Sequence, residues 1–187
     1  MAKKKFFIMG NGGSGTSMLQ GLLNAHTHIK CAFEKITLKN KFEENNKEWT
    51  ACFNRALTAW WGNKVPFEQF ITGKWDDDEI KKIADHGFYI IWIVRRFERY
   101  SHKAVGHRLE TYKKNWARSR DIYFRIKDAY PSTTIMVSFE DILLRPESEL
   151  RRICDFLSLK YEAGMLIGTN NTGFKKYSQS GFNLDKL

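Results

Sequence analysis

A glycine-rich segment near the start of the chain has the residue types that hold an anionic group such as a phosphate. Residues 10–17 read Gly-Asn-Gly-Gly-Ser-Gly-Thr-Ser, which nearly matches the phosphate-loop pattern GxxxxGK[ST]. Glycines let the main chain fold closely around an anion, so that N–H groups and the start of a following helix point at it. Ser14, Thr16 and Ser17 add hydroxyl donors. The segment predicts an anion-binding loop; the alternative is a glycine turn that binds nothing.

Thr16 departs from this pattern, because enzymes that bind nucleoside triphosphates carry a lysine at that position. Their lysine neutralises the β- and γ-phosphates, and its loss disfavours an ATPase or kinase. A phosphate-loop kinase acting on a small metabolite remains an alternative function.

Arg95 is a second candidate ligand for an anion. It directly follows Phe88–Val94, a run rich in Ile, Tyr and Trp that predicts a strand. A guanidinium can grip a phosphate with two hydrogen bonds, whereas an arginine that only ends a strand at the surface is the alternative. Because ligands of open α/β sheets bind at the carboxyl ends of the strands, the glycine loop and Arg95 are expected at one edge.

The elements that must position these residues alternate between strands and helices. Apolar runs predict strands at Phe6–Met9, Ile29–Phe33, Phe88–Val94 and Thr133–Val137. Helices are predicted at Thr16–Asn24, within Glu48–Trp61, from Asp76 to Gly87, within Glu98–Tyr130 and at Ser148–Leu157. This alternation predicts an α/β fold: a three-layer sandwich with a central parallel sheet, of the P-loop-like nucleotide-binding type. A chain of 187 residues suits a single domain.

Four stretches, in order, resemble the sulfotransferases that use PAPS (3′-phosphoadenosine 5′-phosphosulfate). Residues 14–17, Ser-Gly-Thr-Ser, with Leu-Leu-Asn-Ala-His at 22–26, resemble the loop that holds the 5′-phosphosulfate. Ile90–Arg95 resembles the strand whose last arginine holds the 3′-phosphate, and Val137–Leu143 and Pro146–Leu157 resemble the segments that follow. The family lacks the triphosphate lysine, which accounts for the threonine at position 16.

The resemblance implies PAPS as co-substrate and PAP, its desulfonated form, as product. It assigns the nucleotide to Gly12, Gly13, Ser14, Gly15, Thr16, Ser17, Arg95 and Ser101. PAPS carries two anionic groups, so its pocket needs two separated anion sites, which the glycine loop and Arg95 supply. Within the single domain 1–187, residues 39–87 match no part of the family and form a variable, candidate acceptor-binding region.

Two departures from the family pattern concern catalysis. Gly13 stands where family members carry Lys or Arg against the transferring sulfuryl group; Lys30, Lys35 and Arg96 are candidates to replace it. Ser101 is chosen for the 3′-phosphate from a shortened segment in which His102 and Lys103 are alternatives.

The predicted catalytic base is Glu34, which would take the proton of the acceptor hydroxyl. It follows the Leu-Leu-x-x-His segment at a distance similar to that in tyrosylprotein sulfotransferases. The alternative is a surface carboxylate paired with Lys35. His26, His28 and His102 are further candidates.

The charge of the chain favours an anionic partner. It has 31 Lys and Arg against 21 Asp and Glu, a net charge of +10. These cations are spread along the sequence, which disfavours a nucleic-acid binder, and no histidine shows metal-ligand spacing. Three widely spaced cysteines favour reduced thiols and a cytoplasmic location, and no apolar run is long enough to span a membrane.

The predicted function is therefore sulfuryl transfer from PAPS to a hydroxyl or amine of an acceptor, such as an anionic glycan or a small hydroxyl compound. The alternatives are the kinase and a sulfotransferase-like module that binds a nucleotide or polyanion without turnover. Gly13 favours the second of these.

Overall fold

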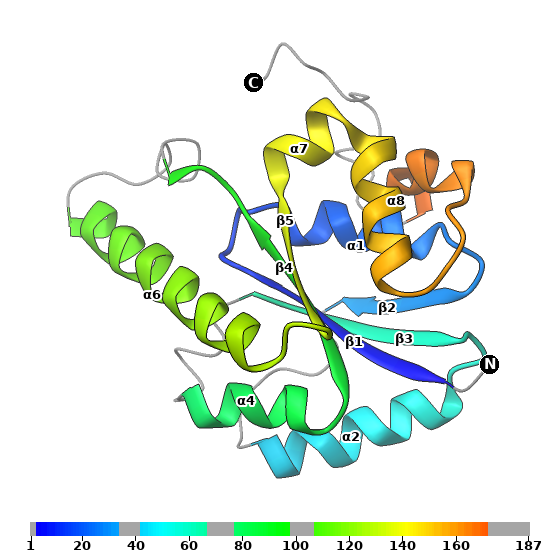
Figure 1. The fold of residues 1–187 in the computed structure, drawn as a ribbon, viewed down its shortest axis with the longest axis horizontal. Helices are drawn as coiled ribbons and strands as arrows, with labels where there is room; N and C mark the ends of the chain where they lie inside the picture. The colour runs from blue at the N-terminus through cyan, green and yellow to red at the C-terminus, as the bar shows by residue number, and fades with distance from the viewer. Residues whose placement is uncertain (1–2, 34–41, 67–76, 98–106, 172–187) are drawn as a thin grey trace.

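Five parallel strands form the central sheet, in the order β2-β3-β1-β4-β5 (Figure 1). The strands are Lys4–Gly10 (β1), Ile29–Phe33 (β2), Trp60–Pro66 (β3), Phe88–Val94 (β4) and Thr134–Ser138 (β5). The structure is a computed structural model that describes residues 3–33, 42–66, 77–97 and 107–171. The central position of β1 places the loop that follows it in the middle of the carboxyl edge of the sheet.

Helices cover both faces of the sheet (Figure 1). One face packs against α2 (Phe42–Arg55), α4 (Asp77–Asp85) and α6 (His107–Ala129). The other packs against α1 (Thr16–Asn24), α7 (Phe139–Leu144), α8 (Pro146–Phe156) and the 3-10 helix η2 (Ala163–Asn171). The predicted three-layer α/β sandwich with a parallel sheet is confirmed.

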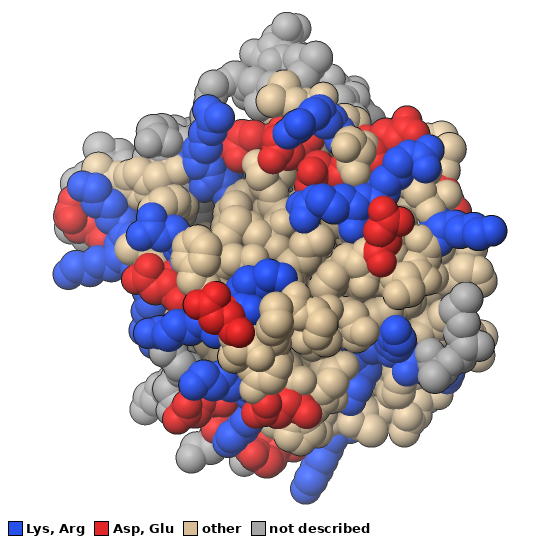
Figure 2. Space-filling model, viewed as in Figure 1, with Lys and Arg blue, Asp and Glu red and all other residues tan. Residues whose placement is uncertain are grey.

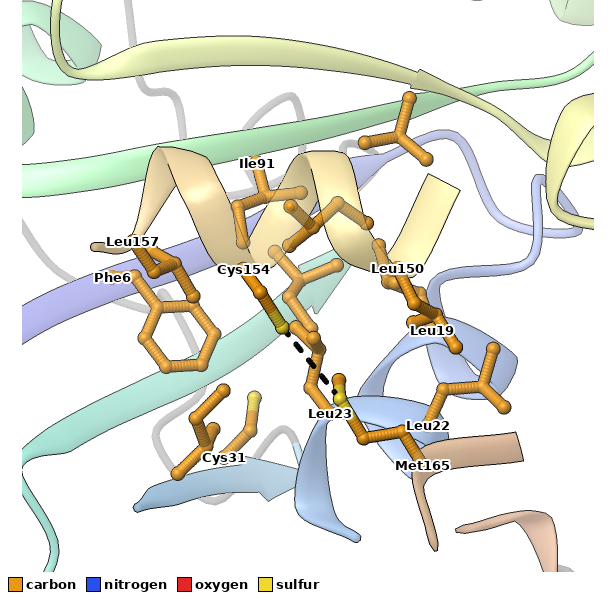
Figure 3. Close-up of a cluster of buried hydrophobic side chains, with 14 of the residues drawn as sticks. Phe6, Leu19, Leu22, Leu23, Cys31, Ile91, Leu150, Cys154, Leu157 and Met165 are labelled. Carbon is orange, nitrogen blue, oxygen red and sulfur yellow. Dashed lines mark hydrogen bonds between the residues drawn. The ribbon is translucent and has the colours of Figure 1, made fainter. Parts of the chain in front are cut away.

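Alternate residues of β1 fill the two hydrophobic cores, because successive side chains of a strand point to opposite faces. Phe7 and Met9 belong to the core under α2, α4 and α6. Phe6 and Ile8 belong to the core under α1 and α8, part of which is drawn in Figure 3. A strand that is buried on both faces has an unbroken apolar sequence, which is why β1 could be predicted from the sequence.

The cysteines of the described residues are free thiols. Cys154 lies in the core beside Met165 of η2, with its Sγ 3.6 Å from the Met165 Sδ (Figure 3). Burial raises the pKa of Cys154 to about 11, so this thiol is a core residue rather than a nucleophile.

The helix predicted within Glu48–Trp61 differs from the observed structure. Helix α2 begins earlier, at Phe42, and ends at Arg55, while Trp60 lies on strand β3. Trp60 and Trp61 alternate between the two cores, as a strand requires, and Leu57, expected on the apolar stripe, is fully exposed. The prediction was wrong here because Gly62, with neighbouring polar residues, made β3 unlike a buried strand.

Side chains cover the backbone at both edges of the sheet. On β2, the Asn24 amide of α1 accepts from the Cys31 N–H at 2.7 Å and donates to the Cys31 carbonyl at 2.9 Å. On β5, Lys127 donates to the Thr134 carbonyl, and Arg152 donates to the Met136 carbonyl, each at 2.7 Å. The edge strands therefore satisfy these polar groups within the domain.

A contact between residues far apart in the sequence joins the turn after α1 to the residue just before η2. The Thr27 hydroxyl and N–H donate to the Glu162 carboxylate. Burial alone would raise the pKa of Glu162, but the two hydrogen bonds from Thr27 outweigh it, and the pKa of this carboxyl lies below its usual value. Separately, within the described ranges, no helix has the length and apolar character needed to cross a membrane.

Candidate functional site

The glycine loop, residues 10–17, joins the carboxyl end of β1 to α1. Gly15 is the N-cap of α1 and has φ 96°, in the left-handed region that favours glycine. A Cβ at this position would lie 2.3 Å from the Phe139 ring of α7. No side-chain cap closes this end of α1 in the described structure. Its first-turn N–H groups are therefore available to an anion above the loop.

Two polar atoms of the loop are buried and without a protein partner in the described ranges. They are the Asn11 Oδ1 and the Ser14 Oγ. Both residues line the cleft described below. A hydroxyl is a donor as well as an acceptor, and the buried Ser14 Oγ therefore fits a ligand that offers acceptor oxygens.

Lys64 extends from β3 to the glycine loop. In the sheet register it lies opposite Ile8, two residues before the end of β1. Its ammonium donates to the Ser17 hydroxyl at 3.2 Å, and the side chain is only 2% exposed. The loop lacks a basic residue of its own, and Lys64 supplies a buried positive charge at its helix end.

Arg95 contacts the same loop from the other side. Its Nη1 donates to the carbonyl oxygen of Gly13 at 3.1 Å. Its guanidinium carbon lies 4.4 Å from the centroid of the Phe139 ring. The main chain at Arg95 is held as well, because the Trp116 indole of α6 donates to its carbonyl at 3.1 Å. The predicted loop and the predicted arginine are thus in direct contact.

A cleft of about 370 Å³ opens between the loop, the ends of β4 and β5, and helices α6 and α7. Its walls combine aromatic and apolar side chains, among them Trp116 and Phe124, with the arginines Arg95, Arg96 and Arg120. Pockets of this kind, apolar with a few placed polar groups, are typical of small-ligand sites. Its chemistry suits a flat ring system bearing negative charge.

Two carboxylates also line this cleft, Glu140 and Asp141 of α7. The Glu140 carboxylate accepts from the Arg96 N–H at 3.1 Å and from the Ser138 hydroxyl at 3.3 Å. Ser138 in turn caps α7 by accepting from the Asp141 N–H. These bonds fix the turn from β5 into α7, which Val137–Leu143 of the sequence contains.

Most of the sequence-predicted ligands lie together. Gly12, Gly13, Ser14, Gly15, Thr16 and Ser17 form one loop and the first turn of α1, and Arg95 contacts that loop. Glu34 and Ser101 lie outside the described residues, and their roles stay predictions. His26 holds structure instead: its Nε2 bonds the Lys160 carbonyl at 2.9 Å, and its Nδ1 accepts from the His28 N–H.

The candidates to replace the missing basic residue at Gly13 did not include Lys64. Lys30 lies opposite Trp61 in the register, three residues back from the level of Phe33 and Lys64. The sequence analysis did not predict β3 as a strand. With that strand predicted, a lysine near its carboxyl end would have been expected beside the loop. Trp116 was also missed, since nothing in a long helix marks which tryptophan faces the site.

The described residues contain no cluster of three or more His, Cys, Asp or Glu able to hold a metal ion. The fold and the glycine loop define the chain as an α/β protein of the phosphate-loop type. Comparison with known proteins narrows this class.

Residues 87–163 match the model of the Sulfotransferase family. Solved structures with the same fold include the sulfotransferase domain from the Synechococcus PCC 7002 olefin synthase. It is 14% identical, with 99% of this chain and 86% of that one covered and a TM-score of 0.73. A sulfotransferase from Alicyclobacillus acidocaldarius is 16% identical, with 97% and 95% covered and a TM-score of 0.60.

A mouse sulfotransferase in complex with PAP is 12% identical, with 97% of this chain and 65% of that one covered and a TM-score of 0.50. No curated protein sequence matches the chain. The resemblance to sulfotransferases is confirmed: residues 87–163 match that family, and the chain has its P-loop-like fold.

Proposed function

We propose that this protein transfers the sulfuryl group of PAPS to a hydroxyl or amine of an acceptor. The observation that carries the proposal is the position of Lys64, whose buried ammonium lies 3.2 Å from the Ser17 hydroxyl of the glycine loop. The absence of a basic residue at Gly13 was the main argument for a module without turnover. Lys64 of β3 answers that argument, because it supplies the loop with a cation that residues 10–17 lack, and a cation there can stabilise negative charge on a bound sulfuryl group.

The two anionic groups of PAPS fit two parts of the site. The glycine loop, with the open first turn of α1 and the Ser14 hydroxyl, suits the 5′-phosphosulfate. Arg95, across the loop, suits the 3′-phosphate, which a guanidinium can grip with two hydrogen bonds. The aromatic cleft between them and α6 suits the adenosine. The mouse sulfotransferase was solved with PAP bound, and its similarity in fold is the support that it lends to this choice of nucleotide.

When bound, PAPS supplies an activated sulfuryl group whose sulfur–oxygen bond breaks as the acceptor attacks, leaving PAP. The residues of this chain bind and orient. Lys64 and the N–H groups of α1 stabilise charge on the phosphosulfate, and Arg95 fixes the nucleotide. Glu34 is the proposed base for the acceptor proton. The proposed cytoplasmic location rests on the free cysteines.

Thermal unfolding with three ligands tests the nucleotide site. The ligands are PAP, AMP, which lacks the 3′-phosphate, and ATP with Mg²⁺. A ligand at about 100 times its dissociation constant adds roughly 2.7 kcal/mol to the free energy of unfolding. For a chain of this size, that raises the midpoint by roughly 5–10 °C. We expect this rise with PAP, a smaller one with AMP, and none with ATP.

A rise with ATP and Mg²⁺ alone would support the kinase and exclude our proposal. If PAP raises the unfolding midpoint instead, the next experiment measures the PAP released from PAPS in the presence of glycan, phenol and small-alcohol acceptors. PAP binding without turnover on any acceptor, or on water, would favour the non-catalytic module.

A further inference from the structure

The cleft beside the glycine loop contains a carboxylate, which is unexpected in a site for an anion. Glu140 lines this cleft together with Arg95 and the loop residue Ser14. Figure 2 shows acidic side chains over α7, beside basic ones. A carboxylate only accepts hydrogen bonds, and it repels a phosphate. A nucleotide in the cleft must therefore present a hydrogen-bond donor, rather than a phosphate, to Glu140.

Two neutral donors fix the carboxylate of Glu140 in place. Its Oε1 accepts from the main-chain N–H of Arg96 at 3.1 Å, and its Oε2 accepts from the Ser138 hydroxyl at 3.3 Å. Asp141, the other carboxylate of the cleft, is bonded instead by the Arg145 guanidinium at 2.7 Å. Because an ionised carboxylate has about four lone-pair sites, Glu140 can keep both bonds and accept another from a ligand.

The strand order places Glu140 away from the glycine loop. The loop follows β1, Arg95 follows β4, and Glu140 lies just past the end of β5. Neighbouring strands are about 4.8 Å apart, so β5 lies on the order of 10 Å from β1, with β4 between them. Along this edge of the sheet, the loop therefore comes first, Arg95 second and Glu140 third.

The donors of the proposed nucleotide are few. With phosphates at the 5′ and 3′ positions, they are the ribose 2′-hydroxyl and the 6-amino group of adenine. The 2′-hydroxyl is next to the 3′-phosphate, so a carboxylate bonded to it would stand beside a like charge. The amino group lies at the far end from the 5′-phosphate, as Glu140 lies beyond Arg95. The faces of the base suit Trp116 and Phe124 of α6, which leaves its edge for Glu140.

We propose that Glu140 accepts a hydrogen bond from the 6-amino group of adenine and thereby selects the base of the nucleotide. The inference rests on the proposed function for the choice of nucleotide. A base without this donor would leave the carboxylate without a partner when the ligand excludes water from it, which costs binding free energy.

Titration calorimetry with two ligands tests this contact. One ligand is PAP, and the other is its 6-deamino analogue, purine riboside 3′,5′-bisphosphate, which has the same charges and lacks only the amino group. The measured quantity is the ratio of the two dissociation constants, in which any effect of Glu140 on the phosphates cancels. We expect the unaltered protein to bind PAP about 10- to 100-fold more tightly, the effect of one hydrogen bond to a charged group.

Two variants of Glu140 should lower this ratio in steps. Glu140→Gln keeps the size and an acceptor oxygen but removes the charge, so the ratio should fall to about 2- to 10-fold, as for a neutral hydrogen bond. Glu140→Ala removes the acceptor, and its ratio should fall below about 2-fold. A ratio in Glu140→Ala equal to that of the unaltered protein would show that another group binds the amino group, which overturns the proposal.

Glu147→Gln is the matched control outside the cleft. Glu147 is an exposed carboxylate of α8 that pairs with Arg151 at 2.7 Å, and it does not line the described cleft. The ratio should stay within about 2-fold of that of the unaltered protein, because exposed charges are screened. A fall as large as in Glu140→Gln would mean that net charge, and not a contact, sets the preference, which also overturns the proposal.

The unaltered protein tests the inference by itself should a Glu140 variant fail to fold. Equal affinity for PAP and the 6-deamino analogue would contradict the role of Glu140 and leave the nucleotide site in place. Failure to bind PAP at all would overturn the proposed function, and this inference with it.

Discussion

Replacing Lys64 by methionine separates catalysis from folding at this site. The lysine is almost completely buried, with its ammonium 3.2 Å from the Ser17 hydroxyl of the glycine loop. Methionine has a similar length and no charge, so it should fill the same space. Burying an ammonium costs free energy. We therefore expect the free energy of unfolding to fall by less than about 1 kcal/mol, or to rise.

The rate should fall steeply. Removing one preorganised donor from a site of developing negative charge costs about 2.7–4 kcal/mol, or 10²- to 10³-fold in kcat. The assay follows PAP released from PAPS with water as the acceptor, so that PAP and sulfate form in equal amounts. Binding of PAP should weaken much less, because Arg95 and the loop N–H groups remain.

Lys30→Met is the control for this substitution. It removes the same charge from neighbouring strand β2, but at an exposed position opposite Trp61, well back from the loop. Its kcat should stay within about 2-fold of the original value, because exposed charges are screened. A Lys64→Met protein that folds, binds PAP and keeps its kcat within about 3-fold would refute the catalytic role of this lysine.

Three further predictions follow from local geometry. Gly15→Ala should abolish the rise in unfolding temperature with PAP, because the new Cβ would overlap the Phe139 ring. Gly87→Ala is the control, since Gly87 also has a positive φ but lies in open space. It should lower the free energy of unfolding in urea by only about 1–2 kcal/mol. Glu162→Gln should lower stability at pH 7. The folded pKa of Glu162 is depressed, so its contribution exists above the usual carboxyl pKa and disappears as the pH falls through the folded value; equal urea midpoints at pH 7 would contradict this. A thiol reagent at pH 8 should modify half-buried Cys52 before Cys154, whose pKa is raised by burial to about 11, and mass spectrometry of the native protein checks this order.

The sequence predicted the parts of the fold whose burial is simple. Strand β4 is buried on both faces, and its unbroken apolar run predicted the bounds that the structure shows, Phe88–Val94. Strand β3 pairs with β1 on the opposite side from β4, but two of its buried side chains, Asn63 and Lys64, are polar. Their burial depends on the loop and strands around them, which no window of residues encodes.

The candidate site was predictable to the same extent. The glycine spacing and the strand before Arg95 predicted that the glycine loop and Arg95 would lie at one edge of the sheet, because parallel strands end together. The bond from Arg95 to the Gly13 carbonyl could not be predicted, because the sequence does not fix the backbone torsions of a glycine, which aim its carbonyl oxygen. The start of α7 at Phe139, inside the segment that resembled the family, was not expected as a helix, because six residues are too few for a periodic pattern.

The covered backbone at the two margins of the sheet bears on how this protein can meet other chains. An exposed strand edge is a template onto which a foreign peptide, or a second copy, can add as a further strand. Here the Asn24 amide occupies the N–H and carbonyl of Cys31, while Lys127 and Arg152 occupy carbonyls on β5. A peptide acceptor joining at these positions would first have to displace them. Recognition of a macromolecular acceptor should therefore depend on its side chains or sugars, and the native sheet should resist growing into fibrils from these margins.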